Sequence, residues 1–154
     1  SLTILEKISL LAKRDIDEYD KDGAHIKEHL IPLSDIIAIL NSLEKKKTSV
    51  FLNESLALES IHAALNNPII QKRIERWCTH PEYQHQTRMI IGYPMKKTIG
   101  YFYELKEPSE SGYLALSSQE CKNLCLVILR NPQDKNDFIL YSAYPRTINS
   151  STWL

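Results

Sequence analysis

The chain has 154 residues, of which 43% are hydrophobic and 25% charged, the size and composition of one ordinary globular domain. Nineteen basic residues balance nineteen acidic ones, which argues against a protein that coats nucleic acid by charge alone, although a nuclease needs only a local basic groove. The sequence has no transmembrane run and no signal peptide, and its three cysteines lack the number and spacing of a disulfide framework or a zinc site.

The first half of the chain, to about residue 78, has the apolar spacing of helices. A stripe that begins at Ile4 marks an opening amphipathic helix, and we expect the polar segment "DEYDKDG" to break it. A short helical turn then carries "AHIKEH" and must end before Pro32, because the residue before a proline disfavours the helical conformation.

Further helices follow this turn. Ser34 can cap the helix "DIIAILNSL", and we expect Lys45, Lys46 and Lys47 to lie in the loop after it. The next helix begins at about Glu54. Asn67, which a proline follows, is typical of the N-cap of a last helix before residue 78.

The second half of the chain is rich in β-branched and aromatic residues, which favour strands. The expected strands are "RMIIGY", "TIGYFYEL", "LCLVILRN" and "FILYSAY". The third is apolar without alternation and should be central, while "NPQDKND" after it predicts a hairpin. We expect a long loop with at most a short strand over residues 106–120, and buried thiols rather than a disulfide at Cys121 and Cys125. Helices followed by strands predict an α+β fold with an antiparallel sheet.

The last expected strand carries polar groups near its end. With a side-chain period of two, Phe138, Leu140, Ser142 and Tyr144 share one face, and Ile139, Tyr141 and Ala143 share the other. We expect Pro145 to end the strand. A hydroxyl and a phenol then point the same way, although a solvated sheet face with an aromatic edge is the commoner reason for such a pattern.

His25 and His29 have the spacing that places two side chains on one face of a helix. A zinc site would need further ligands, and Glu28 faces away from the pair. One of the two imidazoles is enough for acid–base chemistry if it faces a cleft, because the imidazole pKa lies near neutrality. Two ordinary surface or capping histidines remain the third interpretation.

The order of these segments is similar to that of a known family. Gly-x-His-x-x-x-His is followed by "TSVFLNESLALESIHAAL", "IERW", "IGYFYE", "VILRN" and a final "YSAYP". Over residues 23–147 this series resembles the bacterial RNase A-like toxin domain, found at the C-termini of contact-dependent growth inhibition proteins and other polymorphic toxins.

The resemblance implies an RNase A-like α+β fold, with N-terminal helices packed on a curved antiparallel sheet and no disulfides. It implies one toxin domain over residues 1–154, in which residues 1–22 are an integral helix or a remnant of the preceding entry region. It places the family's catalytic histidine at His29 and the preceding one at His25, and it places the family's Thr-Ala-Tyr at Ser142, Ala143 and Tyr144.

The sequence departs from the family at one position. The family uses an arginine on the helix after the histidines, but this chain has none between Arg14 and Arg73. The cation that would bind phosphate must then come from elsewhere. The candidates are Lys45, Lys46, Lys47, Lys27 and Arg146.

The expected activity is an endoribonuclease reaction without metal or cofactor, in which the 2′-hydroxyl attacks the phosphate and leaves a 2′,3′-cyclic phosphate. The substrate would be single-stranded or loop RNA, with tRNA as one example. The resemblance further implies a cognate immunity protein. It also implies secretion as part of a large cell-surface protein, with delivery to a neighbouring bacterium's cytoplasm; we expect a monomer.

Two alternatives differ from this interpretation. An EndoU-like ribonuclease toxin would show two similar antiparallel sheets rather than one curved sheet. A non-catalytic module that binds a protein through its β face would fit the neutral charge and the missing arginine.

Overall fold

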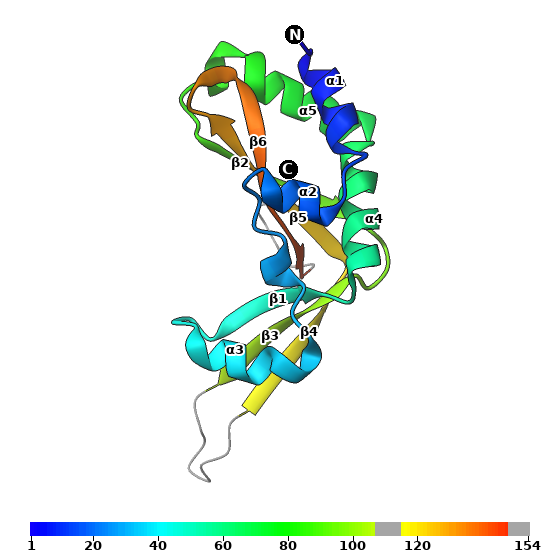
Figure 1. Ribbon diagram of the computed structural model, residues 1–154, viewed down its shortest axis with the longest axis vertical. Helices are drawn as coiled ribbons and strands as arrows, with labels where there is room; N and C mark the ends of the chain where they lie inside the picture. The colour runs from blue at the N-terminus through cyan, green and yellow to red at the C-terminus, as the bar shows by residue number, and fades with distance from the viewer. Residues whose placement is uncertain (107–114, 148–154) are drawn as a thin grey trace.

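The computed structural model describes residues 1–106 and 115–147 and shows an α+β fold (Figure 1). The α-helices are α1 (Ile4–Leu11), α2 (Ile16–Lys21), α3 (Ile36–Ser42), α4 (Glu54–Leu65) and α5 (Pro68–Thr79). Short 3-10 turns are η1 (Lys27–His29), η2 (Leu33–Asp35) and η3 (Pro81–Tyr83). The strands are β1 (Lys47–Phe51), β2 (Arg88–Pro94), β3 (Gly100–Lys106), β4 (Ala115–Cys121), β5 (Asn123–Asn131) and β6 (Asp134–Arg146).

The described strands form two antiparallel three-stranded sheets, with the orders β1-β3-β4 and β2-β5-β6. Helices α1, α2, α4 and α5 share one buried cluster with β2, β5 and β6, whereas α3 packs on β1 and β3 in a second, smaller cluster. The two sheets meet where β6 contacts β1 and β3. The predicted α+β class is confirmed, but the strands form two sheets instead of one curved sheet.

Several predicted elements are confirmed. Helix α4 begins at Glu54, and the Asn67 side chain caps α5 by accepting from the backbone N–H groups of Ile69 and Ile70. Strand β5 is central in its sheet, and every residue from Leu124 to Ile128 is buried. The β5–β6 hairpin is present at the predicted place.

Other expectations were wrong. The segment "DEYDKDG" contributes most of α2 instead of breaking the helical region, because Asp15 and Glu18 form a capping box and Tyr19 is buried. Ser34 does not cap α3; it lies within η2, and Asp35 occupies the N-cap position without a side-chain bond.

Two strands also differ from the expectation. Lys47 begins β1, which pairs with β3, so the lysine run is not entirely a loop. Residues 106–120, where we expect at most a short strand, include residues 115–120 of the seven-residue strand β4, while residues 107–114 lie outside the described part of the chain.

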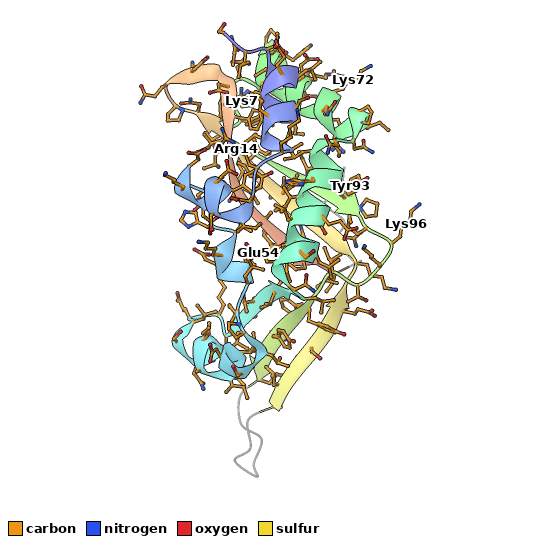
Figure 2. All side chains as sticks on the ribbon, turned by 45° about the vertical axis from the view of Figure 1, so that its right-hand side comes forward. Lys7, Arg14, Glu54, Lys72, Tyr93 and Lys96 are labelled. Carbon is orange, nitrogen blue, oxygen red and sulfur yellow. The ribbon has the colours of Figure 1, made fainter. Side chains whose placement is uncertain are left out.

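The N-terminal segment packs into the same core as the rest of the domain. Ile8, Ile16 and Tyr19 are almost completely buried in the cluster that α4, α5 and β6 also form. Lys7 of α1, which is labelled in Figure 2, forms an ion pair with Asp137 and donates to the carbonyl oxygen of Phe138 at 2.6 Å. In the described part of the chain, no helix is long and apolar enough to span a membrane.

A β-bulge at Tyr141 changes which side chains of β6 share a face. Val127 pairs with Ser142 but Ile128 pairs with Leu140, so Tyr141 is one extra residue on β6. Because two bulge residues oppose one partner residue, the alternation of faces shifts after Tyr141.

The predicted grouping of β6 side chains was therefore wrong. Phe138, Leu140 and Ala143 lie together in the buried cluster. Ser142 and Tyr144 lie on the opposite face, where they stand opposite Val127 and Cys125 of β5. Strand β6 also continues through Pro145, which is tolerated because β6 lies at the edge of its sheet.

Gly100 allows the two sheets to approach closely. A Cβ atom at this position would lie 2.3 Å from the carbonyl oxygen of Val50 and 2.5 Å from Cγ of Pro145. Val50 belongs to the first sheet and Pro145 to the second, so the glycine is required where the sheets meet.

We therefore expect Gly100→Ala to lower the free energy of unfolding by about 2–3 kcal/mol, because backbone atoms must move to admit the methyl group. Urea unfolding followed by circular dichroism measures this change. Ser118→Ala, at an exposed position on the neighbouring strand β4, is the matched control and should be nearly neutral. Equal stability of the two variants would contradict the close approach of the sheets.

Candidate active site

His29 lies between the two sheets. It ends η1, and its Nδ1 atom is 2.7 Å from the carbonyl oxygen of Ser49 on β1. A carbonyl oxygen only accepts hydrogen bonds, so Nδ1 carries the proton and Nε2 keeps a free lone pair. Burial lowers the pKa of His29, although the bond to Ser49 partly opposes this effect. The imidazole is thus held neutral near pH 7, in the form that accepts a proton.

Tyr144 of β6 faces this imidazole from the other sheet. The two ring centroids are 5.2 Å apart, with an interplanar angle of 34°. Burial, together with a hydrogen bond to the thiol of Cys125, raises the pKa of Tyr144 to about 12. The phenol therefore stays protonated near neutral pH and can donate a hydrogen bond to an anion, but it gives up its proton with difficulty.

Ser142 lies on the same face of β6 as Tyr144, with only 7% of its surface exposed. The bulge brings Tyr141 to this face as well. The structure thus brings His29 and Tyr144 together and places Ser142 on the Tyr144 face of β6, through a bulge that regular alternation did not include.

His25 and His29 do not form the expected helical pair, because η1 begins only at Lys27. The backbone N–H of His25 donates to the carbonyl oxygen of Tyr141 at 2.8 Å, and the two rings lie 5.0 Å apart. The His25 Nδ1 atom is 3.2 Å from the Glu28 carboxylate, which does not face away from it. Each histidine is therefore placed by its own tyrosine on β6, and His25 is the more exposed of the two.

The candidate cations are placed very differently. Lys27 forms an ion pair with Asp17, which raises the pKa of Lys27. Lys46, which follows α3, donates to the carbonyl oxygen of Asn41 within that helix at 3.0 Å. Arg146 is close enough to Tyr144 to lower its pKa, in opposition to burial. Among the predicted cations, Arg146 is the one that the structure places beside the His29–Tyr144 pair.

Lys45 and Lys47 are the two remaining candidate cations. Lys45 is exposed before β1, and Lys47 stands opposite Glu104 of β3 in the strand ladder. No contact within residues 1–106 and 115–147 links either lysine to His29 or Tyr144.

Sequence reasoning missed two residues at this site. Arg88, at the start of β2, also lowers the pKa of Tyr144, and Tyr141 packs against His25. Nothing local in the sequence marks Arg88, because it approaches the site across the sheet. The polar pattern around residues 141 and 142 is compatible with a bulge, but only strand pairing reveals it.

In the described part of the chain, no group of three or more His, Cys, Asp or Glu side chains could hold a metal ion. Cys78, Cys121 and Cys125 are buried free thiols, as predicted, and burial raises the pKa of each one.

Comparison with known proteins identifies relatives of this fold. Residues 23–145 match the family described as the bacterial CdiA-CT RNase A domain. A chain in the crystal structure of a CdiA-CT/CdiI complex from Y. kristensenii 33638 is similar with a TM-score of 0.57 at 16% sequence identity. The similarity covers 79% of this chain and 96% of that one, and at this identity it shows a shared fold. No curated protein matches the chain significantly.

The tautomer and the pKa of His29 can be measured without any assay of activity. Its imidazole should be the Nδ1–H tautomer and should titrate below the ordinary value of about 6.5, because burial disfavours the charged form. Long-range ¹H–¹⁵N correlation spectra across pH 4–8, assigned with a His29→Ala sample, measure both properties. An Nε2–H tautomer would contradict the bond to Ser49.

Proposed function

Because the chain belongs to the family of bacterial CdiA-CT RNase A domains, we propose that it is a ribonuclease toxin that cleaves RNA without a metal ion. The observation that carries this proposal is the arrangement of His29 against Tyr144. A neutral imidazole with a free Nε2 lone pair lies beside a phenol that remains a hydrogen-bond donor. The imidazole can act as a base and the phenol as a hydrogen-bond donor to an anion, the two kinds of group that transesterification at phosphate requires.

In the proposed reaction, Nε2 of His29 accepts the proton of the 2′-hydroxyl, whose oxygen attacks the adjacent phosphorus. The bond from phosphorus to the 5′-oxygen breaks, and the leaving oxygen takes a proton. Tyr144 is a poor donor of that proton because its pKa is about 12. His25 is the other imidazole at this face of β6 and is our candidate acid. The products are a 2′,3′-cyclic phosphate and a 5′-hydroxyl.

Negative charge on the phosphate needs donors and cations. The Tyr144 phenol and the Ser142 hydroxyl supply hydrogen bonds from one face of β6. Arg146 and Arg88, whose charges already act on Tyr144, replace the arginine that the family carries on the helix after the histidines. This assignment gives less weight to Lys27 and to Lys45, Lys46 and Lys47 as phosphate ligands.

The biological setting follows from the family. We expect secretion as the C-terminal part of a large CdiA protein, delivery to the cytoplasm of a target bacterium, and neutralisation by a cognate immunity protein. The substrate is single-stranded or loop RNA, with tRNA as one example, because unstacked nucleotides can reach the in-line geometry. The burial of Ile8, Ile16 and Tyr19 supports one domain in which residues 1–22 are integral, and we expect this domain to be a monomer.

The alternatives are less well supported. Two three-stranded sheets are the arrangement we expected of an EndoU-like enzyme, so the number of sheets does not favour the RNase A-like interpretation. The match over residues 23–145 to the CdiA-CT RNase A family favours it instead. A non-catalytic module has no need for the fixed tautomer of His29.

We expect His29→Ala and Tyr144→Phe each to lower kcat for RNA cleavage by about 10²–10³-fold. The first removes the base, and the second removes a hydrogen-bond donor to the anionic phosphate. Both variants should fold and bind the immunity protein. Incubation with total bacterial RNA, gel analysis and chemical identification of the new ends measure the effect. A His29→Ala protein that cleaves at the normal rate would refute the assignment of the base.

Two controls accompany these variants. EDTA should leave the activity unchanged, and complete loss in EDTA would favour a metal-dependent reaction. Absence of cleavage by the parent protein, together with toxicity that persists in His29→Ala, would favour the binding module.

The pH dependence of kcat/KM follows from the two pKa shifts. His29 must be neutral to act as a base, and its lowered pKa keeps it neutral to lower pH, so the acid limb should have its midpoint below pH 6.5. Burial raises the pKa of Tyr144 to about 12, so the phenol stays protonated near neutrality and should cause no loss of activity there. A profile measured on a dinucleotide substrate tests this, and an acid midpoint above 6.5 would contradict the role of His29.

A further inference from the structure

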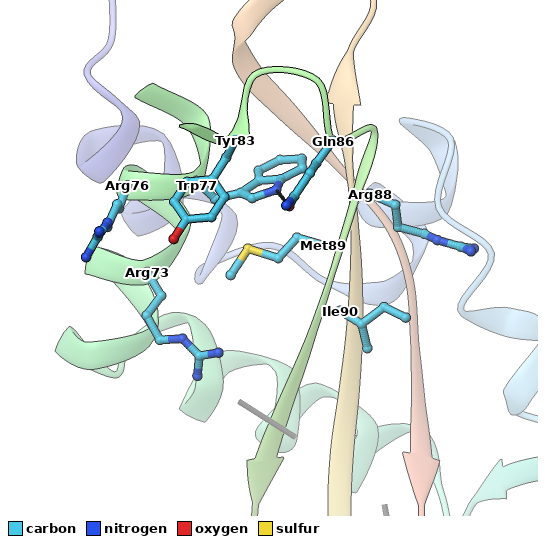
Figure 3. Close-up of a pocket in the computed structure, with 8 residues that line it drawn as sticks. All are labelled: Arg73, Arg76, Trp77, Tyr83, Gln86, Arg88, Met89 and Ile90. Atoms are coloured by element: carbon cyan, nitrogen blue, oxygen red, sulfur yellow. Dashed lines mark hydrogen bonds between the residues drawn. The ribbon is translucent and has the colours of Figure 1, made fainter. Parts of the chain in front are cut away.

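A second basic site lies beside β2, outside the His29–Tyr144 pair. It is a cavity of about 660 Å³, within the range of ordinary ligand sites. Its lining consists of Arg73, Arg76, Trp77, Tyr83, Gln86, Arg88, Met89 and Ile90 (Figure 3). This set contains three arginines and no acidic residue, in a chain whose formal net charge is zero. The cavity is thus a local concentration of positive charge.

The lining combines the two chemistries that bind unstacked nucleotides. Arginine side chains bind phosphate through their planar fork of N–H donors, and flat aromatic or apolar surfaces stack bases. The guanidinium of Arg76 lies 5.9 Å from the ring centroid of Tyr83. Met89 lies between Arg73 and the aromatic residues in Figure 3 and supplies apolar surface in the cavity.

The walls of this cavity are held rigidly. Arg130 is 9% exposed and donates to the carbonyl oxygens of Trp77, Tyr83 and Gln86 at 2.9, 2.7 and 2.9 Å. The Trp77 Nε1 atom donates to Gln86 Oε1 at 3.1 Å, and the guanidinium of Arg130 lies 4.0 Å from the centroid of the indole ring. A ligand would therefore meet a preformed site and lose little free energy in ordering it.

Arg88 connects the cavity to the candidate active site. Its side chain lines the cavity, and its charge acts on Tyr144 across the sheet β2-β5-β6. In Figure 3, Arg88 and Arg73 lie on opposite sides of the β2 ribbon. Arg88, on the edge strand β2, therefore borders both the cavity and the candidate active site.

We propose that this cavity, lined by Arg73, Arg76 and Tyr83, binds a nucleotide of the RNA strand that lies beyond the cleaved bond. The proposal rests on the proposed ribonuclease function and adds a site that acts on RNA chains longer than a dinucleotide. The phosphates of that nucleotide contact the arginines, and its base stacks on Tyr83 or Met89.

The double variant Arg73→Gln/Arg76→Gln tests the proposal with two substrates that share one cleavable step, a dinucleotide and a single-stranded 12-mer. We expect KM for the 12-mer to rise about tenfold, with kcat and the dinucleotide kcat/KM unchanged. The slope of log K for 12-mer binding against log salt concentration should become less steep by about 1.4, since each phosphate contact on a single strand contributes about 0.7 to that slope.

Lys72→Gln is the matched control, because Lys72 is an exposed cation on the same helix and does not line the cavity (Figure 2). Melting temperatures establish that the variants fold, and Arg76→Gln alone replaces the double variant if the latter is unstable.

Each other outcome overturns the proposal in a recognisable way. An unchanged KM for the 12-mer means that the cavity does not hold RNA, and an equal loss on both substrates means that the arginines act on the reaction itself. If the parent protein cleaves neither substrate, the proposed ribonuclease function is wrong. Fluorescence anisotropy with a labelled 12-mer then tests RNA binding by the cavity alone. Equal affinity of the parent and the double variant for the 12-mer overturns the cavity proposal. Normal RNA kinetics with weakened binding to the immunity protein assign the cavity to that partner instead.

Discussion

The candidate active site depends on one hydrogen bond, from the backbone N–H of His25 to the carbonyl oxygen of Tyr141. Tyr141 is the extra residue of a β-bulge, so it has no partner residue in the β5–β6 ladder, and its carbonyl oxygen accepts from the segment that carries the histidines instead. The same bulge places Ser142 and Tyr144 on the face that this segment covers. The distance between imidazole and phenol, and hence any chemistry they share, therefore depends on a local irregularity of β6.

Burial acts on the two central groups in complementary directions. A site with little water disfavours charge, so it lowers the pKa of His29 and raises that of Tyr144. Near neutral pH, the first is then a neutral acceptor and the second a neutral donor. In the proposed reaction, the charge that opposes the phosphate comes from the borders of the site, where Arg146 and Arg88 act on Tyr144. On this proposal, a chain with no arginine on the expected helix still presents cations to the phosphate.

Much of the fold was predictable because its signals are local. The cap at Asn67, the start of α4 at Glu54 and the continuous apolar run of β5 depend on residues close together in the chain. Strand β1 was missed and β4 is longer than expected, because their short, polar sequences become strands only by pairing with β3 on either side. The division into two sheets likewise depends on the contact among Gly100, Val50 and Pro145, which belong to different strands.

The sequence by itself determined the α+β class, the family resemblance and the identity of His29, Ser142 and Tyr144 as candidate groups, because residue types, order and spacing carry that information. Only the tertiary structure decided how these groups meet. The bond that sets the tautomer of His29 is accepted by the carbonyl oxygen of Ser49 on β1. The bulge reverses part of the predicted face of β6, and the charge of Arg88 on β2 acts on Tyr144 across the sheet. Each of these depends on atoms far apart in the chain, whose distances no local pattern records.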